Sequence, residues 1–159
     1  MIKTEEKLFC LLNENGMKIC FAESCTGGLV AERLVGVSGS SAVFDGAMCS
    51  YANAVKEKLL GVKPCVLEKR GAVSADCALQ MAKGALALFG ADIAVSTTGI
   101  AGPTGGTAEK PVGTVYICCA KKTGESYIWR YRFTGDRQTV REKAAEEALQ
   151  MAILAINHG

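Results

Sequence analysis

The sequence has almost no histidine. His158, next to the C-terminal residue, is the only one in 159 residues. Serine and cysteine nucleophiles commonly use an imidazole as their base, and chain ends are usually poorly ordered. We therefore expect no Ser-His-Asp triad, and a nucleophilic serine in this chain would need lysine or tyrosine as its base.

The cysteines lack the spacing of a metal site. None of the eight forms a C-x-x-C pair, and most lie in apolar runs such as KIC, AMCS and YICCA. In such surroundings a thiol behaves as a small hydrophobe. A chain of this length also buries enough surface to fold without crosslinks. We expect reduced, mostly buried cysteines, no metal ion and no cofactor.

The chain also lacks strong charge and long apolar runs. A net charge of +2 does not indicate nucleic acid or an anionic membrane as a partner. No apolar stretch is long enough to cross a bilayer. The N-terminal segment MIKTEEKLFCLL has no small-residue cleavage site and is not a signal peptide. We expect a soluble cytoplasmic protein.

Hydrophobic periodicity and turn residues predict alternating helices and strands. We expect Asn53, Ser74 and Asp136 to cap helices. This order predicts one three-layer α/β/α domain over residues 1–159, with parallel first strands and an antiparallel hairpin. The expected helices are 4–15, 27–35, 53–60, 74–89 and 136–157; the expected strands are 17–22, 43–51, 91–98, 112–120 and 126–133; residues 99–111 have no regular structure.

Three loops should converge at the carboxyl edge of this sheet. The segments AESCTGG, CSYANAVK and TTGIAGPTGG each follow one of the first three predicted strands. Ligand sites of α/β sheets form at this edge. The glycine-rich segment contains no Walker pattern, but its N–H groups could bind an anion. Arg137 could add a phosphate contact, or could be a solvated residue paired with a glutamate.

Ser24 and Lys56 are the candidates for chemistry. Ser24 precedes a helix start, where unpaired N–H groups could hold an oxyanion; alternatively, Ser24 or Thr26 only caps that helix. Tyr51 and Lys56 could face Ser24, and a partly desolvated lysine would have the lowered pKa that a base needs. Alternatively, Tyr51 packs at the sheet edge and Lys56 is solvated. Cys25 is a rival nucleophile, since a helix N-terminus lowers a thiol pKa.

These segments resemble a known family. The stretches AESCTGGLVAERL, GAMCSYANAVKEKLLGV, GAVS and STTGIAGPTGGTAEKPVGTV are similar to the CinA C-terminal domain family, from about residue 5 to residue 155. Its stand-alone members hydrolyse the carboxamide of nicotinamide mononucleotide (NMN), giving nicotinate mononucleotide and ammonia in pyridine nucleotide recycling. The resemblance implies this activity, a homo-oligomer, and a three-layer α/β/α sandwich with a mixed, mostly parallel five-stranded sheet.

The resemblance also implies roles for individual residues. It implies a metal-free catalytic set of Ser24, Tyr51 and Lys56. Many relatives carry the domain behind a larger N-terminal domain, so a non-catalytic nucleotide-binding or regulatory module is the alternative. The implied substrate contacts are Cys25, Thr26, Gly27, Gly28, Thr98, Gly99, Gly102, Gly105 and Arg137.

Overall fold

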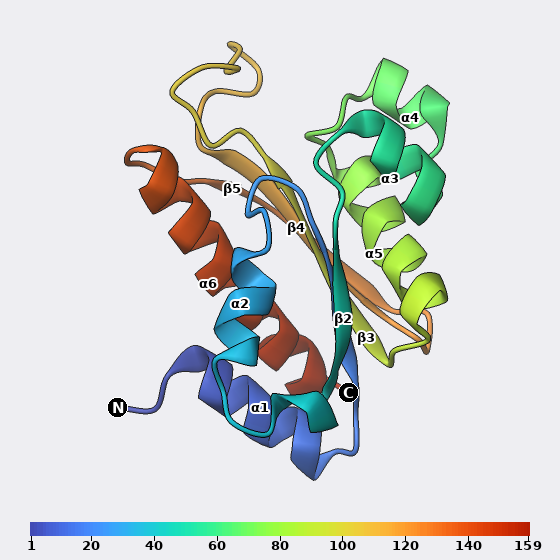
Figure 1. Cartoon of the computed structure of the whole chain (residues 1–159). Coiled ribbons are helices and arrows are strands. Elements are labelled where there is room, and N and C mark those ends of the chain that lie inside the picture. Colours follow the sequence, from blue (N-terminus) through green and yellow to red (C-terminus); the bar gives the residue numbers. More distant parts are fainter.

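A computed structural model describes residues 1–159 and shows a five-stranded sheet between two layers of helices (Figure 1). The strands are β1 (Ile19–Glu23), β2 (Phe44–Cys49), β3 (Ile93–Gly99), β4 (Thr114–Lys121) and β5 (Ser126–Arg132). The helices are α1 (Thr4–Glu14), α2 (Leu29–Val35), α3 (Asn53–Leu60), α4 (Pro64–Lys69), α5 (Ala75–Phe89) and α6 (Arg137–Asn157), with a short 3₁₀ helix η1 (Ser40–Ala42).

The sheet is mixed, with strand order β2-β1-β3-β4-β5. Strand β1 pairs in parallel with both β2 and β3, whereas β3–β4 and β4–β5 are antiparallel. Only β4 therefore runs against the other four strands. The predicted mixed sandwich is confirmed, and the carboxyl ends of β1, β2 and β3 lie at the same edge.

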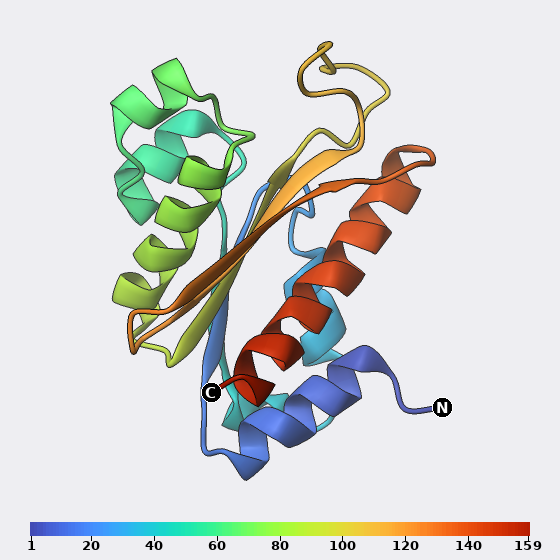
Figure 2. The ribbon, with the colours of Figure 1, turned by 180° about the vertical axis from the view of Figure 1, so that it is seen from behind.

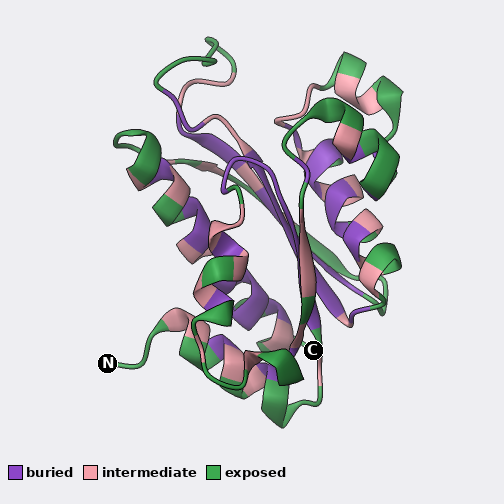
Figure 3. Cartoon of the chain, in the orientation of Figure 1, coloured by how far each residue is buried: buried purple, intermediate pink, exposed green.

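Helices cover both faces of the sheet. Figures 1 and 2 show α1, α2 and α6 on one face and α3, α4 and α5 on the other. Strand β1 alternates its side chains between the two cores: Phe21 packs on the α6 side, and Cys20 packs on the α5 side. Figure 3 shows the central strands buried and most of β5 exposed. The whole of β1 is buried, so the segment that leads into AESCTGG is rigidly held.

Some local predictions were wrong. Helix α4, which starts with Pro64 in its first turn, was not predicted. Asn53 does not cap α3; it is the first helical residue, and the preceding Ala52 makes no side-chain cap. The predicted caps Ser74 and Asp136 are confirmed, because they accept hydrogen bonds from the N–H groups three residues on, at 3.2 and 2.8 Å. None of the helices has the combination of length and apolar character that a membrane-spanning segment requires.

Candidate active site

A cavity of about 280 Å³ opens at the carboxyl ends of β1, β2 and β3. It is bounded by the turn after β1, the start of α3, the segment before α5 and the glycine-rich loop that projects beyond the sheet in Figure 1. The predicted convergence of three loops is therefore present. Its lining residues are Ser24, Cys25, Tyr51, Asn53, Lys56, Ala72, Val73, Thr98, Gly99, Ile100, Ala101, Gly102, Thr104, Gly105 and Arg137.

Ser24 and Lys56 are in direct contact at the base of this cavity. The Lys56 Nζ lies 3.0 Å from the Ser24 Oγ, 2.7 Å from the Ser50 carbonyl oxygen and 3.1 Å from the Tyr51 carbonyl oxygen. Only 8% of Ser24 and 1% of Lys56 is exposed. Burial lowers the pKa of the Lys56 amine from its usual 10.5, because the low-dielectric interior disfavours the ammonium form. Lys56 is buried, so the interpretation of a solvated lysine is wrong.

The packing of α3 on α5 determines the position of Lys56 at the base of the cavity. A Cβ added to Gly84 of α5 would lie 1.9 Å from the carbonyl oxygen of Leu60, so these two helices approach closely only because position 84 has no side chain. Helix α3 can then direct Lys56 inward beneath the loop that carries Tyr51. The buried amine makes its hydrogen bonds to three uncharged groups, which leaves it without a carboxylate that would stabilise its charge.

Glu23 organises the turn that carries Ser24. Its Oε1 accepts hydrogen bonds from the Thr26 hydroxyl at 2.6 Å and from the N–H groups of Gly28 and Val30 at 3.2 and 2.9 Å. Its Oε2 accepts from the N–H of Ala31 at 3.1 Å. A carboxylate at a helix N-terminus satisfies the unpaired donors there and is favoured by the helix dipole. Sequence reasoning missed Glu23, although an acid at the end of an apolar strand was a signal.

This arrangement contradicts two sequence-based interpretations. Glu23 caps α2, so neither Ser24 nor Thr26 serves as its cap, and the N-cap residue makes no side-chain bond. Cys25 does not have an activated thiol: burial, with a smaller contribution from the nearby Glu23 charge, raises its pKa to about 12. The helix N-terminus does not lower the Cys25 pKa, because the thiol is buried and because the Glu23 carboxylate already occupies that terminus.

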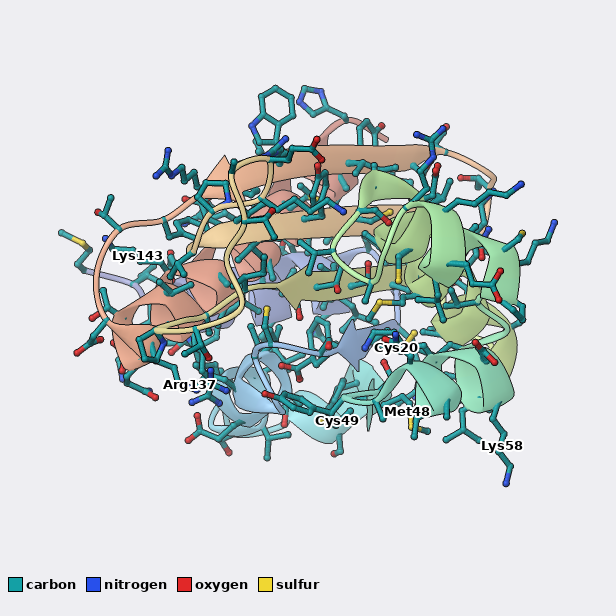
Figure 4. The ribbon with its side chains drawn as sticks, turned by 90° about the horizontal axis from the view of Figure 1, so that it is seen from above. Cys20, Met48, Cys49, Lys58, Arg137 and Lys143 are labelled. Atoms are coloured by element: carbon teal, nitrogen blue, oxygen red, sulfur yellow. The ribbon has the colours of Figure 1, made fainter.

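Tyr51 and Arg137 meet at the mouth of the cavity. Tyr51 is 60% exposed, and its hydroxyl accepts a hydrogen bond from Arg137 Nη2 at 3.0 Å. Arg137 Nη1 also donates to the Gly102 carbonyl at 2.8 Å, and Figure 4 shows Arg137 at the start of α6. The alternative of a glutamate partner for Arg137 is wrong. Tyr51 reaches Lys56 through its carbonyl; no hydrogen bond joins its hydroxyl to Ser24 or Lys56.

The glycine-rich loop forms another wall. Gly99, Gly102 and Gly105 line the cavity, as does Thr98. Gly102 and Gly105 have φ values of 84° and 92°, a backbone conformation that side-chain-bearing residues rarely adopt. The Thr98 hydroxyl donates to the carbonyl of Ala72 at 2.8 Å and so ties β3 to the segment before α5.

Three of the expected substrate contacts do not line the cavity. Thr26, Gly27 and Gly28 instead shape the turn behind Ser24, and both glycines have positive φ values of 58° and 102°. Arg141 on α6, which sequence reasoning also missed, holds this turn through the carbonyls of Cys25 and Thr26. A helical arginine four residues after Arg137 gives no signal in the sequence that it reaches so distant a segment.

A second cavity, of about 520 Å³, lies between β5 and the C-terminal half of α6. It is larger than the first and mostly apolar, but none of the sequence-predicted site residues borders it. The predicted nucleophile and base, Ser24 and Lys56, line the smaller cavity. The residues around the larger one are Tyr127, Trp129, Tyr131, Glu147, Met151, Leu154, Ala155 and His158.

The Ser24 hydroxyl is hydrogen-bonded to the buried Lys56 amine at the carboxyl edge of an α/β sheet. This pair places the chain among proteins with a serine–lysine site. The model of the CinA C-terminal domain family matches residues 1–156, and the chain belongs to this family. The nicotinamide-nucleotide amidohydrolase PncC of Enterobacter agglomerans is 49% identical over 142 residues, which cover 89% of this chain and 87% of that protein.

Other relatives are longer than this chain. A CinA-like protein of Geobacter sulfurreducens is 50% identical over 139 residues, covering 87% of this chain but 33% of the relative. A second, from Thermosipho melanesiensis, is 47% identical, covering 92% of this chain and 36% of its own length. The chain thus spans about a third of the length of these two relatives.

Solved structures show the same fold. The competence/damage inducible protein CihA of Agrobacterium tumefaciens superposes with a TM-score of 0.94 at 41% identity, over 97% of this chain and 93% of that one. A CinA superfamily protein of Klebsiella pneumoniae gives 0.93 at 33% identity, over 99% and 100% of the two chains.

Proposed function

We propose that residues 1–159 form one catalytic domain that hydrolyses the carboxamide of NMN to nicotinate mononucleotide and ammonia. The contact between the Lys56 Nζ and the Ser24 Oγ, both buried beside a ligand-sized cavity, carries the proposal. The relative named as a nicotinamide-nucleotide amidohydrolase, 49% identical and matched over most of both chains, supports the choice of substrate.

In the structure the Lys56 Nζ donates to all three of its partners; as a neutral amine acting as a base, it would instead accept from the Ser24 hydroxyl. A neutral amine has two N–H hydrogens and one lone pair. The carbonyls of Ser50 and Tyr51 can only accept, so they take the two hydrogens. The lone pair is then left for the third partner, the Ser24 hydroxyl. Because burial lowers the Lys56 pKa, this neutral form is more accessible than in an exposed lysine.

The proposed reaction follows from this proton arrangement. The Ser24 Oγ attacks the carboxamide carbon while its proton passes to Lys56. The resulting ammonium of Lys56 protonates the leaving nitrogen as the carbon–nitrogen bond breaks, and ammonia departs. Water then attacks the acyl ester, again with Lys56 as base, and releases the carboxylate product and free Ser24. The reaction therefore proceeds in two acyl-transfer steps, with the proton shuttled at Lys56.

Tyr51 acts on this pair through its backbone carbonyl, which orients the Lys56 amine. Its hydroxyl and the Arg137 guanidinium meet at the mouth of the cavity, where they would contact the substrate. A guanidinium suits a phosphate, which it can bind with two parallel hydrogen bonds. We therefore propose that Arg137 and the loop that carries Gly102 and Gly105 hold the ribose phosphate.

The test is ammonia release by the purified protein from NMN, nicotinamide riboside and nicotinamide, with the acid product identified by mass. We expect release from NMN, and a loss of kcat/KM of at least about tenfold for the riboside, which lacks the phosphate. Equal rates for NMN and the riboside would contradict the phosphate contact. Binding of NMN without ammonia would instead identify a nucleotide-binding module.

A further inference from the structure

Two backbone N–H groups beside Ser24 have no hydrogen-bond acceptor within the chain. They belong to Cys25 and Thr26, whereas the N–H of Gly27 donates to the Ser24 carbonyl at 3.0 Å and the N–H of Gly28 donates to a side chain at 3.2 Å. Free donors next to a nucleophile are what an oxyanion hole needs, provided that their directions are fixed in advance. Of these two residues only Cys25 lines the cavity, because Thr26 is fully buried. What fixes these directions lies on another element.

Arg141 of α6 holds the peptide groups of this turn. Its Nε donates to the Cys25 carbonyl at 3.1 Å, and its Nη2 donates to the Thr26 carbonyl at 2.9 Å. Its Nη1 donates to the Gln138 side chain at 2.8 Å, which steadies the guanidinium on its own helix. Arg141 does not line the cavity, so its contacts with the turn are made from behind.

Because peptide groups are planar, the hydrogen bonds that Arg141 makes to carbonyls also fix the orientation of neighbouring N–H groups. The Cys25 carbonyl shares a plane with the Thr26 N–H and points the opposite way, so Arg141 directs the Thr26 donor away from itself. The Thr26 carbonyl shares a plane with the Gly27 N–H. That N–H holds the Ser24 carbonyl, whose own peptide plane carries the Cys25 N–H. One guanidinium therefore fixes the series of peptide groups that ends at the free Cys25 N–H, and hydrogen-bonded peptides in series polarise one another.

We propose that Arg141 is a positioning residue that orients the N–H of Cys25, a residue that lines the cavity, as an oxyanion-hole donor for attack by Ser24. The inference rests on the proposed function only in taking Ser24 as the nucleophile. Its role differs from that of Arg137, because Arg141 acts on the transition state through the backbone and leaves substrate binding unchanged. Fixed hydrogen bonds to two carbonyls at once require the planar guanidinium of arginine, which a lysine ammonium lacks.

The test compares Arg141→Met and Arg141→Lys with Arg33→Met, a matched control. Arg33 is also a partly buried guanidinium with two partners, Glu5 and Glu146 at 2.6 and 2.7 Å, but it lies outside the cavity. The first readout is the rate at which a fluorophosphonate labels Ser24, followed by intact mass. The second is kcat and KM for NMN. Thermal unfolding of each variant shows that it is folded.

We expect Arg141→Met to lower both the labelling rate and kcat by about 10–100-fold, with KM changed by less than about threefold. The labelling rate and kcat of Arg141→Lys should lie between those of Arg141→Met and the wild type. Those of Arg33→Met should match the wild type. Labelling and kcat within about twofold of wild type in folded Arg141→Met would overturn the proposal. A raised KM with unchanged kcat, or an equal loss in Arg33→Met, would also overturn it.

Labelling separates this inference from the proposed function, because it does not depend on NMN. A wild-type protein that is labelled at Ser24 but releases no ammonia would refute the amidohydrolase function alone, and the Arg141 comparison would still stand. A wild-type protein that the probe does not label would overturn the oxyanion-hole proposal itself, because a serine with a base and a formed hole reacts with a phosphonylating agent.

Discussion

Replacing Lys56 by methionine should separate activity from stability. Methionine keeps most of the aliphatic stem but removes the amine and its three hydrogen bonds. Leaving two buried carbonyls unpaired costs about 1–3 kcal/mol each. Against this, the wild type loses free energy by burying an amine whose charged form is disfavoured there. We expect these terms to offset, so that the free energy of unfolding stays within about 2 kcal/mol of wild type.

Activity should respond very differently. Loss of a general base costs about 10²–10⁴-fold in rate, equivalent to about 3–5 kcal/mol of barrier. The wild-type kcat/KM should rise with pH as the Lys56 ammonium loses its proton, with a midpoint below the usual pKa of 10.5, because burial lowers the Lys56 pKa. The Lys56→Met variant should lack this rising limb, because methionine has no proton to lose.

The stability of the wild type should also increase with pH, as its kcat/KM does. A lysine whose folded-state pKa is lowered binds fewer protons when folded than when unfolded, so its contribution to stability increases as pH rises through the folded-state pKa towards 10.5. Between about pH 7 and pH 10, the free energy of unfolding in urea should increase more for the wild type than for Lys56→Met. Full activity in the variant, or a retained rising limb, would refute the role of Lys56 as base.

Further predictions concern the groups around this pair. Glu23→Gln should lower unfolding stability by about 1–3 kcal/mol in urea melts, because an amide cannot accept at both ends, whereas the exposed Glu142→Gln should change little; equal stabilities would refute the capping role. Cys25→Ser should retain kcat, because burial raises the thiol pKa to about 12; loss of turnover in a folded variant would revive Cys25 as the nucleophile. Gly84→Ala should force α5 away from the Leu60 carbonyl and lower Tm, and an unchanged Tm would contradict that close approach.

The approach of Ser24 to Lys56 could be anticipated from the sequence. Both follow strands that the sequence marks as neighbouring and parallel, and parallel strands bring their carboxyl ends to one edge. The depth of Lys56 could not be anticipated, because it depends on the close contact of α3 with Gly84 of α5. That contact joins segments whose relative placement no local pattern encodes.

The roles of Glu23 and Arg141 could not be predicted from the sequence either, because they also depend on how distant segments pack. Glu23 caps α2 only because the chain doubles back within the turn, which brings N–H groups as far along as Ala31 to its carboxylate. Arg141 reaches that turn only because α6 packs beside α2. Strand β2 ends at Cys49, two residues before the predicted end, so Tyr51 lies in the loop after the strand, where its hydroxyl meets Arg137.

The nucleophile assignment is tested most directly by Ser24→Ala, because alanine removes one oxygen from a buried position and little else. Ammonia release from NMN and NMN binding by calorimetry would be measured on the wild type and the variant, with EDTA present. We expect the wild type to release ammonia, and Ser24→Ala to bind NMN but to release none. Turnover by Ser24→Ala at the wild-type rate would contradict the nucleophile assignment, and loss of NMN binding would make Ser24 a binding or structural residue.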